Sequence, residues 1–258
     1  MSGVIKRARA QYERDGYCFA PTIIPPELIE RVIPRMDAVI AGEYETGVPP
    51  HSRRWNPGDN EGTLCKIDQP HLSDGTISEL IGYSGIGRWA AGITGAKYIQ
   101  AWAVQLLYKP PGGEQLGNVG WHQDKQYWSY WEGEVFTAWV ALSNVTEASG
   151  PMRFVQGSHK WGLRDGGDFF GSDHEAQRQA IQIPAGEAWE EIPAILPPGG
   201  VSFHHPLTLH GSGPNRSTFP RRSFAIHLRT EKSRPIAENY YVSHLDDQTV
   251  CPIIYQEK

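Results

Sequence analysis

The spacing of hydrophobic residues changes character near residue 98. Upstream, apolar side chains recur every three or four positions from Leu28 to Ile40 and again from Ile77 to Ile93. This spacing is typical of helices that bury one face. We therefore expect a helical layer over about residues 1–97, with a turn-rich loop from His51 to Pro70.

Downstream of residue 98 the apolar positions alternate with their neighbours, as expected for β-strands. The segments with this pattern are 98–108, 136–142 and 224–228, with shorter candidates at 153–156 and 201–205. Helices followed by many short strands predict a mainly β fold with α, in which a jelly roll or barrel carries helices on one side. We expect a single domain over residues 1–258, with the jelly-roll core at about 98–258.

Composition and charge argue against nucleic-acid and membrane partners. The 258 residues include 28 Gly and 20 Pro, which favours many turns and few long helices. The 24 basic and 29 acidic residues leave a net charge of −5 without a basic run, so we expect no nucleic-acid partner. No apolar stretch is long enough to cross a bilayer and the start has no apolar signal core, so we expect a soluble, cytoplasmic protein with no membrane partner.

One short motif carries candidate chemistry. Trp121-His122-Gln123-Asp124 follows a segment with two glycines. On an extended chain, residues i and i+2 project to the same side, so the His122 imidazole and the Asp124 carboxylate can converge on one point. An isolated pair of this kind is more often a hydrogen-bonded couple than half of a metal site.

A second motif strengthens the metal interpretation. His210 follows much later, in His210-Gly211-Ser212-Gly213. Two imidazoles and one carboxylate suit non-haem Fe(II) and leave adjacent coordination positions open, although the same donors also suit zinc. A buried guanidinium would bind the far carboxylate of an anionic co-substrate, and Arg221 is the candidate. Alternation places Arg221 and Arg222 on opposite faces of a strand, but alternation alone does not say which one faces the barrel interior.

These ordered motifs resemble the phytanoyl-CoA dioxygenase (PhyH) family of Fe(II)/2-oxoglutarate-dependent oxygenases over nearly the whole chain. The motifs are Asp15-Gly16-Tyr17, Lys109-Pro110-Pro111, His122-Gln123-Asp124, Gly150-Pro151-Met152 with Gly157-Ser158-His159, and His210-Gly211-Ser212-Gly213. The resemblance implies a double-stranded β-helix, the cupin-like jelly roll, with an N-terminal helical layer.

The resemblance also implies residue roles. His122, Asp124 and His210 match the family's iron ligands, and Arg221 matches the arginine that binds the C5 carboxylate of 2-oxoglutarate. Ser212 matches a hydroxyl contact to the same co-substrate. Further co-substrate contacts are implied for three more residues, of which Gln105 matches in position only: Lys66, Gln105 and Trp139.

The implied activity is a dioxygenase that uses Fe(II), 2-oxoglutarate and O2 to hydroxylate a small-molecule metabolite, with release of succinate and CO2. Because Asp124 fills the position that halogenating relatives leave to chloride, we expect an oxygenated product. A non-catalytic jelly-roll ligand-binding protein and a zinc-dependent hydrolase are the alternatives, and succinate release separates them from the dioxygenase. We interpret His204 and His205 as core or hydrogen-bonded residues, and we expect Tyr127 or Trp128 to touch the substrate. The pattern names neither that substrate nor the oligomeric state.

Overall fold

The computed structural model describes residues 2–112 and 117–257. In these ranges the larger antiparallel sheet has the strand order β1-β10-β7-β12-β4-β3-β2, and β14 also pairs with β4. Its strands are β1 (Tyr17–Ala20), β2 (Ser52–Arg53), β3 (Cys65–Asp68), β4 (Tyr98–Lys109), β7 (Val135–Ala141), β10 (Val201–His204), β12 (Arg221–Thr230) and β14 (Ile253–Gln256).

A smaller antiparallel sheet has the order β5-β11-β8-β9 and faces the inner side of the larger one. Its strands are β5 (Val119–His122), β8 (Met152–Val155), β9 (Glu191–Pro193) and β11 (His210–Ser212), while β6 (Trp131–Glu132) pairs with β13 (Arg234–Pro235) alone. Side chains from both sheets meet in one apolar cluster, which includes Leu107, Trp139 and Phe154. Two facing antiparallel sheets with a helical layer confirm the predicted jelly roll.

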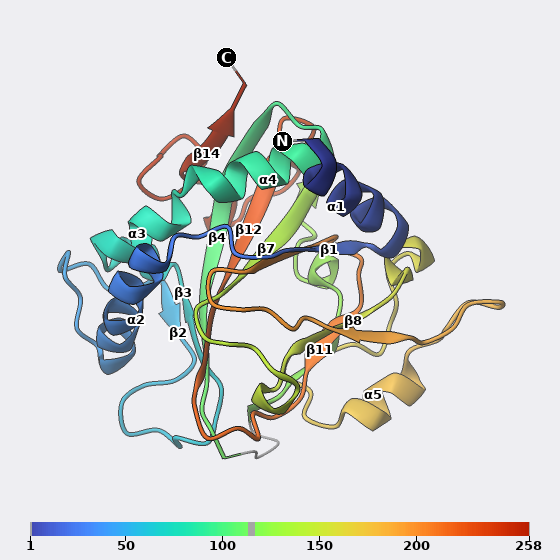
Figure 1. Cartoon of the computed structure of the whole chain (residues 1–258), viewed down its shortest axis with the longest axis horizontal. Helices are drawn as coiled ribbons and strands as arrows, with labels where there is room; N and C mark the ends of the chain where they lie inside the picture. The colour runs from blue at the N-terminus through green and yellow to red at the C-terminus, as the bar shows by residue number, and fades with distance from the viewer. Residues whose placement is uncertain (1, 113–116, 258) are drawn as a thin grey trace.

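Helices cover the outer side of the larger sheet (Figure 1). They are α1 (Ser2–Asp15), α2 (Pro26–Ala41), α3 (Gly75–Ile81) and α4 (Ser84–Thr94), whereas α5 (His174–Ala180) lies beside the smaller sheet. The largest apolar core forms between these four helices and the outward residues of the sheet, such as Leu106, Phe224 and Ile226. The other face of the sheet is thereby left to line the space between the two sheets.

Burial and contacts establish the orientation of the two arginines on β12. Arg221 is 1% exposed and faces the interior, on the same side as Ala225 and His227. Arg222 faces the helical layer, where its Nη2 lies 2.8 Å from Asp37 Oδ2 of α2. The arginine selected by the family resemblance is therefore the one that points into the space between the sheets.

Two details of the predicted N-terminal layer were wrong. The expected loop from His51 to Pro70 contains β2 and β3, and β1 also joins the larger sheet. β3 is only four residues long and carries polar Lys66 and Asp68 on its inner face, so its apolar pattern is too short to recognise. The expected helix over 77–93 is two helices, because α3 ends at Gly82 and α4 begins after Tyr83.

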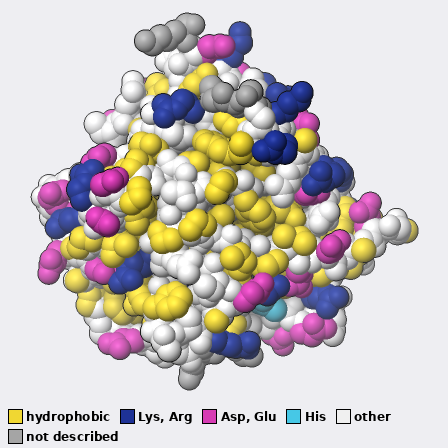
Figure 2. All heavy atoms as spheres, in the orientation of Figure 1, with side chains coloured by type: hydrophobic (Ala, Val, Ile, Leu, Met, Phe, Trp, Pro, Cys, Tyr) yellow, Lys and Arg dark blue, Asp and Glu magenta, His cyan; other side chains and the backbone are white. Residues whose placement is uncertain are grey.

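Charged side chains of both signs are mixed on the surface of the protein (Figure 2). Figure 2 shows Lys and Arg side chains mixed with Asp and Glu around the outline of the displayed face. In the ranges that the structure describes, no helix combines the length and the apolar character needed to span a bilayer.

Candidate metal centre and active site

A small pocket lies between the two sheets. It combines apolar and polar walls, which is typical of small-molecule sites. Its lining consists of Gln105, Leu107, Val119, His122, Asp124, Thr137, Trp139, Met152, Phe169, His204, His210, Gly211, Ser212, Arg221, Ala225 and His227. The sequence predicted eight residues that bind the metal or the co-substrate. Seven of these eight line the pocket, and Lys66 does not.

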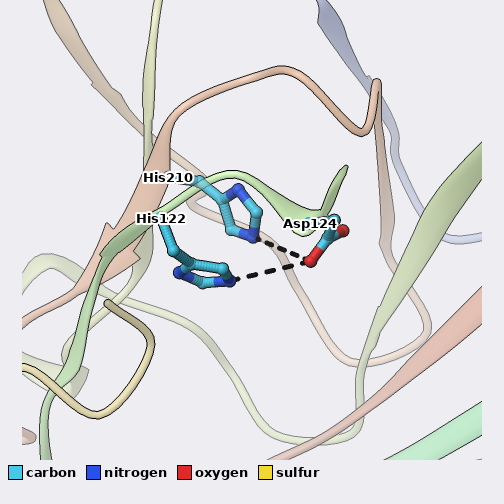
Figure 3. Close-up of side chains that lie close together, drawn as sticks. All are labelled: His122, Asp124 and His210. Atoms are coloured by element: carbon cyan, nitrogen blue, oxygen red, sulfur yellow. Dashed lines mark ion pairs between the residues drawn. The ribbon is translucent and has the colours of Figure 1, made fainter. Parts of the chain in front are cut away.

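Three potential metal ligands converge at this cavity (Figure 3). His122 ends β5 and His210 begins β11, and these two residues are direct partners across the antiparallel pair. Asp124 follows His122 after one extended residue, so its carboxylate returns to the same side. Asp124 Oδ1 lies 3.6 Å from His122 Nε2 and 3.7 Å from His210 Nε2. These distances exceed a hydrogen bond but match atoms that share one metal ion.

Both imidazoles are hydrogen-bonded through Nδ1, which leaves Nε2 of each ring to bind a metal. His122 Nδ1 lies 2.8 Å from the Gly120 carbonyl oxygen, and His210 Nδ1 lies 2.9 Å from that of Thr208. Because a carbonyl only accepts, each Nδ1 must carry the proton, which leaves the Nε2 lone pair directed at the shared point. Burial lowers the pKa of His210 well below its usual value, so this ring is neutral near pH 7. The donor set therefore fits a divalent iron ion.

The second oxygen of Asp124 is held by neighbouring side chains. Thr137 Oγ1 donates to Asp124 Oδ2 at 2.7 Å, and His204 Nε2 lies 3.2 Å from the same oxygen. The Thr137 hydroxyl in turn lies 2.9 Å from His227 Nδ1, which must be the donor because Thr137 has already given its own proton. These contacts leave Asp124 Oδ1 as the oxygen free to bind a metal.

Arg221 provides the positive charge of the cavity. Its Nη1 donates to the Gly150 carbonyl oxygen at 2.6 Å, whereas its buried Nε has no partner among the described residues. Its guanidinium carbon lies 5.3 Å from the Trp139 ring centroid, and burial lowers its pKa to about 10. A buried guanidinium with an unused donor is well suited to a carboxylate that enters the cavity. Ser212 lines the cavity as well, so the predicted partner is in place.

Four predicted residues remain: the co-substrate contacts Gln105 and Lys66, and the substrate contacts Tyr127 and Trp128. Gln105 lines the cavity, but the Lys66 ammonium pairs with Asp68 Oδ1 at 2.5 Å and lies outside the lining. Of the two expected substrate contacts, Trp128 is buried in a separate apolar cluster. Tyr127 is 45% exposed, and its hydroxyl accepts a hydrogen bond from the backbone of Phe169 at 2.9 Å.

Sequence reasoning missed several residues around the cavity. Thr137 and His227 share an inward face with Trp139 and Arg221, so strand alternation could have identified them. Phe169 lies in an irregular segment and packs edge-on against the His122 ring, with ring centroids 5.0 Å apart. No periodic signal marks a loop residue of this kind.

Comparisons with known proteins agree on one family. The family model described as phytanoyl-CoA dioxygenase (PhyH) matches residues 12–223. The probable alpha-ketoglutarate-dependent hypophosphite dioxygenase of Stutzerimonas stutzeri is 26% identical over 237 residues, covering 88% of this chain and 79% of that protein. The ectoine dioxygenase of Halomonas elongata is 26% identical over 247 residues, covering 90% and 71%.

Solved structures support the fold. The crystal structure of the epimerase SnoN in complex with Fe3+, alpha ketoglutarate and nogalamycin RO superposes with a TM-score of 0.70. The match covers 94% of this chain and 89% of that chain at 21% sequence identity. At this identity the likeness concerns the fold alone.

Proposed function

Because the chain belongs to the phytanoyl-CoA dioxygenase family, we propose that it hydroxylates a small-molecule metabolite and releases succinate and CO2. The enzyme is a dioxygenase that depends on iron and 2-oxoglutarate, as its family does. The observation that supports the proposal most strongly is the convergence of two imidazole Nε2 atoms and one carboxylate oxygen in a cavity that also holds Arg221.

In this proposal His122, Asp124 and His210 would hold Fe(II) through the two imidazole Nε2 atoms and Asp124 Oδ1. The backbone carbonyls of Gly120 and Thr208 orient the two rings. Bound Fe(II) would supply the chemistry that uses O2 and 2-oxoglutarate to oxidise the substrate.

The protein's remaining task is to position the co-substrate and exclude water. Arg221 donates to the C5 carboxylate of 2-oxoglutarate, and Ser212 adds a hydroxyl contact to the same group. Trp139 stacks beside the guanidinium and shields it from solvent. Leu107 and Phe169 supply apolar walls that limit water around the reacting carbon.

Asp124 also supports oxygenation over halogenation. The position is filled by an ionised side chain that Thr137 and His204 hold in place. A chloride ion would have to displace this tethered anion before it could bind there. Mass spectrometry of the product formed under labelled O2, with chloride and bromide present, checks the prediction. A halogenated product from the unmutated protein would refute it.

The decisive test is succinate formation from 2-oxoglutarate in a small-molecule panel. The panel includes hypophosphite, ectoine and phytanoyl-CoA, the compounds in the names of relatives. We expect one class of compound to accelerate succinate release in the presence of Fe(II) and O2, and to gain one labelled oxygen atom. Hydrolysis of a panel compound with Zn(II) but no succinate would favour a zinc hydrolase. Ligand binding without any turnover would favour a binding protein.

A further inference from the structure

Two fully buried cations lie side by side at the end of the larger sheet. Lys109 ends β4 and Arg221 begins β12, and the two residues are direct partners across the antiparallel pair. Lys109 is 0% exposed and Arg221 is 1% exposed. Like charges at directly opposed positions destabilise a sheet, and burial adds a desolvation cost to each charge. Such an arrangement therefore calls for an anion nearby.

The described part of the chain does not supply that anion. None of the ion pairs found among residues 2–112 and 117–257 includes Lys109 or Arg221. Arg221 faces the cavity, but Lys109 is absent from its lining and lies behind Ser212. Lys109 can act on a ligand in the cavity only through Ser212 or through its charge.

The contacts of Lys109 define the direction of the Ser212 hydroxyl. Lys109 Nζ lies 2.7 Å from Ser212 Oγ, 3.3 Å from the Ser212 carbonyl oxygen and 2.5 Å from the Gly213 carbonyl oxygen. A protonated lysine has three N–H donors and no acceptor, so these three contacts use its full capacity. Ser212 Oγ is then the acceptor, and its own proton is directed elsewhere. Because Ser212 lines the cavity, that proton is available to a ligand beside Arg221.

We propose that Lys109 is a positioning residue for the co-substrate: it fixes the Ser212 hydroxyl as a donor into the cavity and thereby selects a keto acid with a second carboxylate. The inference rests on the proposed function, because it assumes that 2-oxoglutarate binds beside Arg221. It adds a residue that touches neither iron nor co-substrate.

Charge balance supports the same role. Burial, and then the neighbouring Arg221, lower the pKa of Lys109 well below its usual value. A carboxylate bound in the cavity opposes both effects and favours the protonated amine, which is the form that must donate to Ser212. The co-substrate and the lysine therefore stabilise each other's charged state.

The test compares two keto acids that differ in one group. 2-Oxopentanoate has the carbon skeleton of 2-oxoglutarate but lacks the C5 carboxylate. Isothermal titration of Mn(II)-loaded protein measures the affinity of both compounds without turnover. In Lys109→Met we expect 2-oxoglutarate to bind about 10- to 100-fold more weakly, because a hydrogen bond to a charged group is lost. The affinity for 2-oxopentanoate should stay within about threefold, as should kcat at saturating 2-oxoglutarate.

Further variants separate positioning from general damage. Lys160→Met removes an exposed lysine that donates to the Arg14 carbonyl oxygen, and it should change neither affinity. In a double-mutant cycle, Lys109→Met should cost less than about threefold once Ser212 is alanine, since the two residues act in series. Should Lys109→Met fail to bind Mn(II), Lys109→Leu supplies the same comparison with another side chain that has no donor.

The outcomes distinguish the two proposals. Equal weakening of both keto acids, no weakening of either, or full additivity with Ser212→Ala would overturn the role of Lys109 and leave the proposed function intact. Failure of the unmutated Mn(II) protein to bind either keto acid would overturn the proposed function and this inference together.

Discussion

Replacing Thr137 with valine should weaken metal binding although Thr137 is not a ligand. Asp124 Oδ2 accepts two hydrogen bonds, a short one of 2.7 Å from Thr137 and a longer one of 3.2 Å from His204. Valine has nearly the same shape as threonine and fits the site, which is 1% exposed, without a cavity. The substitution therefore removes one hydroxyl and little else, so Oδ2 is free to turn and Oδ1 loses its fixed direction.

The magnitude follows from the chemistry of that bond. A hydrogen bond to an ionised acceptor contributes about 1.5–3 kcal/mol, and each 1.4 kcal/mol corresponds to about tenfold in affinity. Loss of a group that orients a metal ligand typically costs about 10- to 100-fold in metal affinity. A second cost arises because His227 Nδ1 loses its acceptor in a buried position. An unsatisfied buried donor costs about 1–3 kcal/mol, which should appear as a lower free energy of unfolding in metal-free protein.

Competition with a fluorescent chelator measures Fe(II) or Mn(II) affinity, and urea denaturation measures stability. We expect Thr137→Val to bind the metal about 10- to 100-fold more weakly, whereas Thr137→Ser keeps the hydroxyl and should stay within about threefold of the unmutated protein. If the valine variant binds metal as tightly as the unmutated protein, the hydrogen bond does not orient the carboxylate and the reasoning is refuted.

Four other variants test the remaining parts of the site and the fold. Asp124→Ala should abolish Fe(II)-dependent succinate formation with an unchanged circular dichroism spectrum, and retained turnover would contradict the assigned ligand set. Arg221→Leu should weaken 2-oxoglutarate binding by more than about 30-fold in a titration, since a charge-assisted pair is lost. Arg222→Leu should have less than about a threefold effect, because Arg222 faces the helical layer; the reverse order would identify the wrong arginine. Burial lowers the pKa of His71 from 6.5 to about 4. Below pH 6.5 the unfolded chain therefore binds a proton that the folded chain does not, and stability should fall by up to about 1.4 kcal/mol per pH unit until about pH 4. The slope from urea denaturation at several pH values should be smaller in His71→Gln, and an unchanged slope would show that His71 does not contribute.

Much of the fold could be predicted because strands with a strict alternation are easy to recognise. β4, β7 and β12 are long enough for the period of two to show, and the pattern from Leu28 to Ile40 lies within α2. The missed strand β3 is short, and its inner residues Lys66 and Asp68 form an ion pair instead of an apolar face. Its position in the sheet depends on pairing with β4, which local sequence does not encode.

The metal site could be predicted in part, because two of its three ligands are close together in the sequence. The two-residue spacing of His122 and Asp124 places both on one side of an extended segment, which is a local property. His210 joins them through the pairing of β11 with β5, a contact between distant residues that local spacing does not encode. Phe169 could not be found at all, because its contact with His122 depends on the path of an irregular loop.

The contacts that complete the site join residues that are distant in the sequence. This distance determines when the site can form during synthesis of the chain. Lys109 and Ser212 are 103 positions apart, and Thr137 and His227 are 90 positions apart. During synthesis the N-terminal parts of a chain emerge first, and contacts between distant residues form slowly because long loops must close. β4 and β5 therefore leave the ribosome long before β11 and β12 can pair with them. A nascent chain that ends before residue 210 carries His122 and Asp124 without their partner, so iron and co-substrate binding are acquired together, late in synthesis.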